Sequence, residues 1–360
     1  MITRVSHQTP LALRSKTAIA HAFKLQVGVA DIPHPDKASR GGEDSYFVCD
    51  RALGVADGVG GWAESGVNPK DYSQGLMDVA KAYYCEENQR EGAEEGPEDG
   101  PEEGRGGDNG QRGRDNAGTV IVDDSGAMYD AAGPSARTTS GATPRASKSS
   151  MEALKRAHAE TQKPGSSTAC IVQIDLETGA LDSSNLGDSG FLVVRDGSVV
   201  MRSEFQEHFF DCPFQLASLR FVPETDQATD AAVLSGQVEA GDLIVIGSDG
   251  LFDNVPVEDM LLAVRAVDQD ASADGSAGGS GSGRAQAIAE ALGAMAFANS
   301  QDPEYESPYA LEARKQGYEL SFLEKIQAAK FTEGGLQLGQ ITGGKMDDVT
   351  VVVAEITEQA

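Results

Sequence analysis

The sequence predicts an α+β fold in which layered sheets are set apart from the helices. Strand-like runs follow one another between residues 167 and 202 with only short turns between them, which favours antiparallel meanders. The helix-like segments lie before and after that region, so strands and helices do not alternate as they do in a doubly wound parallel sheet. No internal repeat is visible in the sequence.

Strands are expected where short apolar or alternating runs are bounded by turn-forming residues. In chain order they are Phe23–Ala30, Ser45–Asp50, Ala52–Ala56, Ser167–Leu176, Ala180–Asn185, Phe191–Val194, Ser198–Arg202, Leu243–Ile246 and Val349–Val353. The strongest hairpin signal is Asp196-Gly197, because this dipeptide supplies the positive φ that a tight turn needs. The apolar runs that end at Ala56 and Ile246 predict buried strands.

Helices are expected at Asp71–Glu87, Met151–Thr161, Val257–Val267 and Arg284–Ala298, and another begins at Ser307-Pro308. In the first helix Leu76, Ala80 and Tyr83 fall on one face, as helical periodicity requires. Ser149 or Ser150 caps the second helix. The last begins with a capping serine followed by proline in the first turn.

The composition predicts a single domain spanning residues 23–357 with two interruptions. The segment 86–150 is rich in Gly, Glu, Asp, Ser and Arg, and it cannot bury enough apolar surface to offset its ordering entropy. We therefore expect a disordered insertion there. The Gly/Ser-rich segment 271–283 predicts a flexible loop. The remaining residues suffice for one large domain.

The charge and the cysteines narrow the function classes. The net charge is −28, most of it outside the insertion, so nucleic acid and anionic membranes are not expected partners. No run approaches the roughly 20 apolar residues that span a bilayer. The four cysteines form no zinc-like or redox-like spacing, which favours structural thiols in a reducing interior.

Residues 1–22 have two interpretations. Residues 1–30 contain no Asp or Glu but include four basic residues among Ser, Thr and Ala, which is the composition of an organelle transit peptide. The alternative is a ragged start that is not cleaved. A secretory signal is not expected, because no continuous apolar stretch follows the charges.

Carboxylates lie beside strand-like runs at three places in the chain. Asp57-Gly58 and Asp249-Gly250 each follow an apolar run, and Asp347-Asp348 immediately precede another. If the strand ends meet at one edge of a sheet, they gather oxygen ligands of the kind that Mg²⁺ and Mn²⁺ prefer. The glycines let the backbone turn sharply and approach an ion, and their carbonyls can also be ligands.

Further acids extend this set. Glu43-Asp44 precede the strand expected at residue 45, Asp188 lies between two strands, and Asp253 follows Asp249 by one helical turn. Each acid alone is a weak signal, since Asp-Gly is foremost a turn dipeptide. The specific signal is their order and context together.

In that order and context, the chain resembles a metal-dependent Ser/Thr protein phosphatase of type 2C. The matching segments, between residues 23 and 356, are Gly42-Glu43-Asp44, Ala56-Asp57-Gly58-Val59-Gly60-Gly61, Gly165-Ser166-Ser167-Thr168-Ala169, Asn185-Leu186-Gly187-Asp188-Ser189, Ser248-Asp249-Gly250-Leu251-Phe252-Asp253 and Asp347-Asp348-Val349-Thr350. The chain is most similar to the mitochondrial branch, marked by Asp-Gly-Val-Gly-Gly-Trp at residues 57–62. Residues 32–37, 208–210 and 213–216 are also typical of it.

The resemblance implies a four-layer α-β-β-α sandwich of two antiparallel sheets flanked by helices, with a binuclear Mn²⁺ or Mg²⁺ site at one end. Asp57 is expected to bridge the two ions, and the carbonyl of Gly58 to bind one. The other expected ligands, direct or through water, are Glu43, Asp249 and Asp347 with Asp44 beside them, while Asp188 and Asp253 match positions that hold a weaker third ion.

The resemblance also implies the reaction. A hydroxide between two ions roughly 3.5–4 Å apart is expected to attack a phosphoserine or phosphothreonine in line, so no covalent phosphoenzyme is needed. Arg40 is the expected phosphate-holding catalytic residue. Phosphoproteins are the expected partners, and the protein is expected to be a monomer. A mitochondrial location follows from the branch, with plastid and cytoplasm as alternatives.

Three residues depart from the family pattern. Val59 stands where most members have a histidine that protonates the leaving alkoxide. General acid catalysis contributes about 10²–10⁴-fold, against an acceleration of up to ~10²¹ for phosphate monoesters, so an active enzyme is still expected. Water, His34 or His208 is expected to substitute. Gly190, in place of arginine, predicts a lost surface or salt-bridge contact, and Asp348 stands where asparagine is common.

An alternative function belongs to a different class, a pseudophosphatase that acts as a regulatory binding module. The intact Asp57, Asp249 and Asp347 count against it, whereas Val59 and the acidic insertion count for it. Metal affinity and turnover discriminate between the two.

Overall fold

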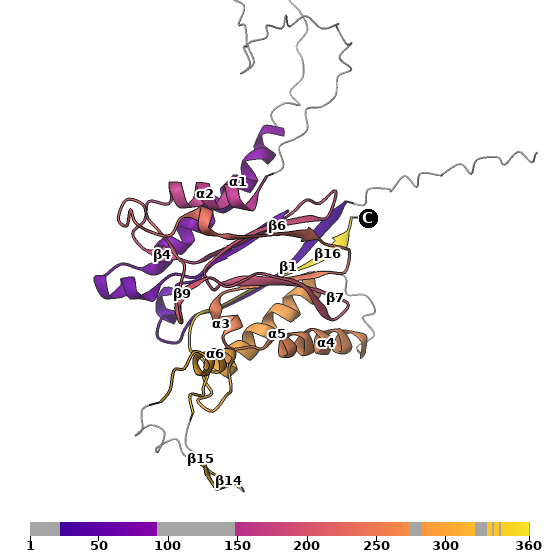
Figure 1. The fold of residues 1–360 in the computed structure, drawn as a ribbon. Coiled ribbons are helices and arrows are strands. Elements are labelled where there is room, and N and C mark those ends of the chain that lie inside the picture. Colours follow the sequence, from indigo (N-terminus) through magenta and orange to yellow (C-terminus); the bar gives the residue numbers. More distant parts are fainter. Residues whose placement is uncertain are drawn as a thin grey trace, which may run out of the picture. The chain divides into compact units, whose positions relative to one another are not determined.

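The computed structural model describes residues 22–91, 148–273, 282–320, 330–332, 335–337 and 340–359. Two five-stranded antiparallel sheets are stacked on each other (Figure 1). In spatial order the first sheet contains β1 (Phe23–Ile32), β16 (Val349–Glu358), β13 (Leu243–Gly247), β7 (Gly190–Arg195) and β8 (Ser198–Arg202). The second contains β12 (Ala232–Gln237), β6 (Ala180–Leu186), β5 (Ala169–Ile174), β3 (Ala52–Ala56) and β2 (Ser45–Cys49). The predicted α+β class is confirmed.

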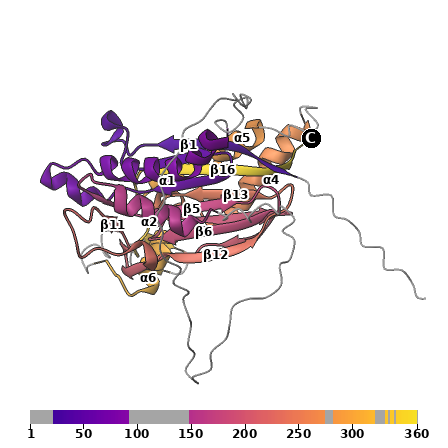
Figure 2. The same cartoon turned by 90° about the horizontal axis from the view of Figure 1, so that it is seen from above.

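Helices cover the outer face of each sheet and complete the four layers (Figures 1 and 2). On the second sheet lie α1 (Pro69–Glu91) and α2 (Ser150–Glu160), and on the first lie α4 (Val257–Ala273) and α5 (Ser282–Ser300). The short α3 (Asp249–Phe252) follows β13 directly, and α6 (Pro308–Lys315) follows α5. As the sequence predicted, the Ser307 side chain accepts a hydrogen bond from the backbone of Ala310 at the start of α6.

Alternation along the strands explains the layers, because successive side chains of a strand point to opposite faces. Leu53 and Val172 of the second sheet pack with Phe191 and Ile244 of the first in the core between the sheets. The neighbouring Ile171 packs on the other face, in the cluster that includes residues of α1 and α2. Both faces of these strands are buried, so they appear as continuous apolar runs in the sequence.

The outer edge of β1 is closed by a side chain of α5. The Gln286 amide donates to the carbonyl oxygen of Val29 and accepts from its N–H, both at 2.9 Å. The close approach requires glycine at position 28, where a Cβ would lie 2.2 Å from the backbone nitrogen of Gln286. An open edge strand is a template for pairing with other chains, and this helix protects it.

Gly28→Ala is accordingly expected to lower the free energy of unfolding by about 1–3 kcal/mol, the usual cost of overpacking a tight contact. Urea denaturation measures it. The matched control is Gly283→Ala on the same helix α5, where a Cβ meets nothing within 4 Å. Equal midpoints for the two variants would show that β1 and α5 separate at little cost.

Several expected boundaries were wrong. The strand expected at Ser167–Leu176 is divided into β4 (Ser166–Ser167) and β5, because the backbone of Thr168 turns aside to bond Asp57. The sequence analysis missed β12, whose side chains alternate between half-buried and exposed at the edge of the sheet. The other missed elements are α3, β9 (Glu207–Phe209), β10 (Cys212–Pro213), β11 (Leu216–Ala217), β14 (Lys330–Thr332) and β15 (Gly335–Gln337), together with the 3₁₀ turns Ala38–Arg40, Gly60–Ser65 and Ala228–Asp230.

The two predicted interruptions begin and end inside helices. α1 extends to Glu91, and α4 and α5 take residues from both ends of the loop expected at 271–283. The remainder of the insertion and of that loop, with residues 1–21, lies outside the described residues. Within the described part of the chain, no helix is both long and apolar enough to cross a membrane.

Candidate active site

The predicted acidic residues come together where the two sheets meet at one end. Asp57 ends β3, Asp249 begins α3 just after β13, and Asp347 lies shortly before β16. The carboxylates of Asp249, Asp44, Asp347 and Asp188 all lie close enough to Asp57 to raise its pKa. Strands from both sheets therefore contribute to one cluster, which we call the acid cluster: Glu43, Asp44, Asp57, Asp188, Asp249, Asp253 and Asp347.

Burial and mutual repulsion raise the pKa of most of these carboxyl groups. Burial first, and then the charges of Asp249 and Asp44, raise the pKa of Asp57 well above its usual range. Burial and the nearby Asp348 raise the pKa of Asp44 to about 8. For Asp253 burial is again the largest cause, and its pKa rises to about 7. Buried carboxylates at this density need cations to stay ionised.

Five oxygen atoms of the cluster are buried and have no hydrogen-bond partner within the described residues: Oδ1 and Oδ2 of Asp44, Oδ1 of Asp188, Oδ1 of Asp249 and Oε2 of Glu43, the last of which is in ion-pair contact with Lys37. An unsatisfied buried acceptor is costly, and groups of this kind usually have an ion or water as partner. The donor set is oxygen only, which fits Mg²⁺ or Mn²⁺. In the described part of the chain no group of three acidic, His or Cys side chains is already arranged to hold a metal ion.

Two lysines that the sequence analysis did not select lie among these carboxylates. The Nζ atom of Lys345 is 2.7 Å from Asp249, 3.0 Å from Asp253 and 3.0 Å from Asp211. Burial opposes the charge of Lys345, but these carboxylates outweigh it and raise its pKa. The backbone of Lys345 is fixed as well, since its N–H and carbonyl both bond the buried Asn254 side chain.

Lys37 occupies the other side of the cluster. Its Nζ atom lies 2.6 Å from Oε2 of Glu43, 3.0 Å from Asp347 and 3.4 Å from Asp348. Asp348 is buried and accepts hydrogen bonds from the backbone of Glu43 and of His34, so it holds both loops in place. The only sequence signal for Lys37 was its place in the branch-typical segment 32–37, and Lys345 had none beyond its proximity to Asp347.

Arg40, the expected phosphate-binding residue, lies at the mouth of the cluster. Its guanidinium group donates to Oε1 of Glu43 at 2.9 Å, and 44% of its side chain is exposed. The structure therefore places Arg40 beside an expected metal ligand and in contact with solvent.

The loop after Asp57 is held by hydrogen bonds to Thr168 and to Ser166 of β4. Thr168 accepts a hydrogen bond from the Asp57 N–H through Oγ1 and donates its own N–H to the Asp57 carbonyl. Gly58 has no room for a side chain, since a Cβ would lie 2.6 Å from the carbonyl oxygen of Glu43. Trp62 donates through its indole N–H to Oγ of Ser166 at 2.8 Å, which anchors the end of this loop.

His34 and His208, the two histidines considered as substitutes for the missing general acid, both contact residues outside the acid cluster. The Nδ1 atom of His34 accepts from the backbone of Asp36 at 3.0 Å. His208 is 45% exposed, stacks on Phe214 and contacts Asp226 at 3.0 Å. No contact with the acid cluster is seen for either imidazole within the described residues.

The expectation for Gly190 was wrong. Position 190 is buried in β7, opposite Gly247, and carries no surface contact. A Cβ there would lie 2.6 Å from both the Phe205 ring and Oγ of Ser203. The absent side chain makes room for Phe205, which projects over a pocket beside the acid cluster.

Known proteins are similar to this chain over most of its length. A family model described as Stage II sporulation protein E matches residues 115–302. The chain is 32% identical over 337 residues to the Probable protein phosphatase 2C 26 of Arabidopsis thaliana, covering 93% of this chain and 84% of that protein. The chain belongs to the protein phosphatase 2C family. This phosphatase is also 31% identical over 325 residues to the human Protein phosphatase PTC7 homolog, covering 88% of this chain and 80% of that protein.

A solved structure agrees with the fold. The photosystem II phosphatase PBCP is 30% identical, with a TM-score of 0.63, and the match covers 92% of this chain and 98% of that one. The predicted family and its implied sandwich are thus confirmed, and this protein is a metal-dependent protein serine/threonine phosphatase. These matches lend no support to the alternative of an inactive binding module.

Proposed function

We propose that the acid cluster binds two divalent cations, Mn²⁺ or Mg²⁺, and hydrolyses phosphoserine and phosphothreonine in proteins. The observation that carries this proposal is the set of buried carboxylate oxygens without a hydrogen-bond donor. The residues that would hold the ions are Asp57, Glu43, Asp249 and Asp347 with Asp44 beside them, together with the carbonyl of Gly58. When bound, the ions supply the charge that activates water and neutralises the phosphoryl oxygens.

The chain's own cations orient these ligands. Lys345 holds Oδ2 of Asp249, which leaves the buried Oδ1 for an ion. Lys37 contacts Oε2 of Glu43 and Oδ1 of Asp347. Arg40 contacts the other Glu43 oxygen, so an ion at Glu43 competes with these two cations. Arg40 is proposed to hold the substrate phosphate, because its fork of donors matches phosphate oxygens and its side chain reaches solvent. A third ion at Asp188 and Asp253 shares Asp253 with Lys345, so we propose that it binds more weakly.

We further propose a mitochondrial location, which the similarity to the PTC7 homologue supports. The similarity to the photosystem II phosphatase supports the plastid as the alternative. The substrates are proposed to be phosphoproteins and the protein a monomer.

The test is hydrolysis of p-nitrophenyl phosphate and of a phosphothreonine peptide with Mn²⁺, with Mg²⁺ and with EDTA, alongside calorimetric titration of each ion. We expect turnover with either ion, none in EDTA, and two binding events at the acid cluster. Turnover that survives EDTA would contradict the proposal. So would saturable binding of the ions without any turnover, which would restore the regulatory-module alternative.

A further inference from the structure

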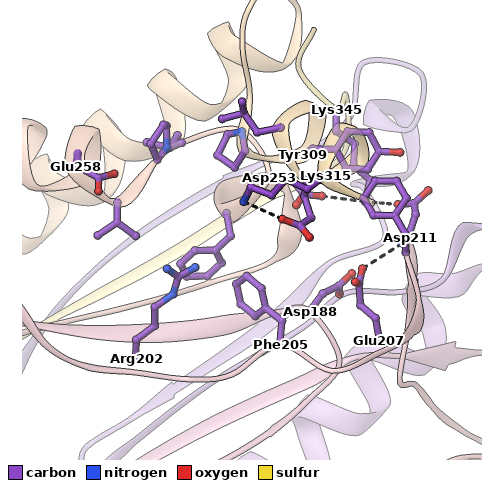
Figure 3. A pocket seen from close by; sticks show the side chains of 18 residues that line it. Asp188, Arg202, Phe205, Glu207, Asp211, Asp253, Glu258, Tyr309, Lys315 and Lys345 are labelled. Carbon is purple, nitrogen blue, oxygen red and sulfur yellow. Dashed lines mark hydrogen bonds and ion pairs between the residues drawn. The ribbon is translucent and has the colours of Figure 1, made fainter. Parts of the chain in front are cut away.

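A pocket of about 500 Å³ opens directly beside the acid cluster (Figure 3). Asp188 and Asp253 belong both to the cluster and to the pocket wall. Lys345 joins the two, because it lines the pocket and contacts Asp249 as well as Asp253. Pockets of this volume are large enough for a small ligand or for a side chain with its flanking backbone. A substrate whose phosphate lies at the cluster therefore extends past this opening.

Half of the residues that line the pocket are apolar or aromatic, and some of them face solvent. Phe205 and Leu311 are each 38% exposed, and Phe205 packs edge-on against Phe252 with ring centroids 5.4 Å apart. Figure 3 shows Phe205 on one side of the pocket and Tyr309 on the other. Exposed apolar surface that is gathered in a concave site gains free energy when an apolar group covers it. The position of Phe205 depends on Gly190, as described above.

The charge of the pocket is unbalanced. Six carboxylates line it against three cationic side chains. Lys345 is already paired with cluster acids, and Lys315 is paired with Glu312 at 3.1 Å. Glu207 and Glu258 stand exposed in the lining. A ligand with a positive charge near the pocket is therefore favoured over one with a negative charge. Salt should weaken this preference, because the charges are exposed.

We propose that this pocket receives an apolar side chain of the phosphoprotein substrate, within about three residues of the phosphorylated Ser or Thr, and that its acids favour an adjacent Lys or Arg. An extended peptide advances about 3.3 Å per residue, so a residue in that range reaches the pocket while the phosphate stays at the acid cluster. The inference rests on the proposed function and adds which residues the enzyme prefers around the phosphorylated Ser or Thr of its substrates.

The experiment uses the full chain with Mn²⁺ and a set of phosphothreonine peptides. In each peptide leucine replaces alanine at one of the three positions on either side of the phosphothreonine. We expect leucine to raise kcat/KM about tenfold at one position, the discrimination that a hydrophobic pocket achieves. In Leu311→Ala the gain should fall towards onefold. In Val233→Ala, which changes an exposed apolar residue on β12 of the other sheet, it should remain tenfold.

Glu258→Gln supplies a second variant whose exposed position keeps the fold intact. In this variant a lysine placed beside the leucine should raise kcat/KM less than it does in the wild type. The increase in kcat/KM that the leucine itself causes should be unchanged. Turnover of p-nitrophenyl phosphate, which is too small to reach the pocket, is measured for every variant. If the wild type cleaves it but shows no leucine preference, or if Leu311→Ala keeps the preference, the pocket proposal is wrong. If the wild type does not cleave it with either ion, the proposed function fails first.

Discussion

Asp57→Asn is expected to lower turnover of p-nitrophenyl phosphate by more than about 100-fold. Loss of a residue that only hydrogen-bonds a metal ligand already lowers metal affinity or activity by about 10–100-fold, and Asp57 is proposed to be a ligand itself. Asp57 is the carboxylate surrounded by most other members of the acid cluster, and its backbone is fixed on both sides by Thr168. Asparagine keeps the shape but removes the charge. Steady-state kinetics with Mn²⁺ measures the loss.

The same variant is expected to be more stable than the wild type in EDTA, by about 1 kcal/mol, since folding no longer has to bury a carboxyl group whose ionisation is unfavourable there. With Mn²⁺ the order should reverse, because a ligand that binds only the folded state at 100 times its Kd adds about 2.7 kcal/mol. Urea denaturation under both conditions measures this. Asp50→Asn, on the exposed turn between β2 and β3, is the matched control and should change neither value. An Asp57→Asn protein that gains as much stability from Mn²⁺ as the wild type would exclude Asp57 as a ligand.

A pH dependence accompanies this result. Burial and neighbouring acids raise the pKa of Asp44 to about 8 and of Asp253 to about 7, above the value of about 4 in the unfolded chain. The folded metal-free protein therefore binds more protons than the unfolded one between these values, and its stability should fall as the pH rises from about 4 to 8. Asp57→Asn should flatten this slope in EDTA.

Lys345→Met is expected to lower the free energy of unfolding by about 3 kcal/mol in EDTA. Removing one partner of a largely buried ion pair leaves the remaining charges uncompensated, which is strongly destabilising. Here three carboxylates, those of Asp211, Asp249 and Asp253, lose one shared cation. Divalent ions should restore more stability to this variant than to the wild type, because Asp253 becomes free to bind an ion.

The control for this prediction is Lys315→Met in the same pocket. The Lys315 side chain is 72% exposed and paired only with Glu312 in the described structure, so its loss should cost less than about 0.5 kcal/mol. Calorimetric titration of Mn²⁺ counts the ions. An unchanged count together with wild-type stability would mean that Lys345 neither neutralises the acid cluster nor competes with a third ion.

The strands and the acids at their ends were predictable from the sequence for a local reason. A strand buried on both faces is a continuous apolar run, and the order of the acids along the chain distinguishes those at the strand ends from ordinary turn residues. Asp57 and Asp249 were found in this way. β12 was missed because an edge strand with one exposed face has no such run, and its partner β6 is distant in the sequence.

Lys37 and Lys345 could not have been selected by local pattern. Each has a long side chain that reaches carboxylates from segments far apart in the chain, and only the assembled sheets bring these segments together. The role of Gly190 was mistaken for the same reason. A missing side chain looks like a lost contact in the sequence, whereas the fold shows what occupies the space instead.

The position of β16 has a consequence for the order of events during synthesis. This strand lies between β1 and β13, so it pairs with one of the first and one of the later strands of the described chain. Until the ribosome has released it, β1 has no partner in its sheet, β13 exposes one edge, and Asp347 is absent from the acid cluster. The nascent protein therefore completes neither its first sheet nor the acid cluster before β16 inserts.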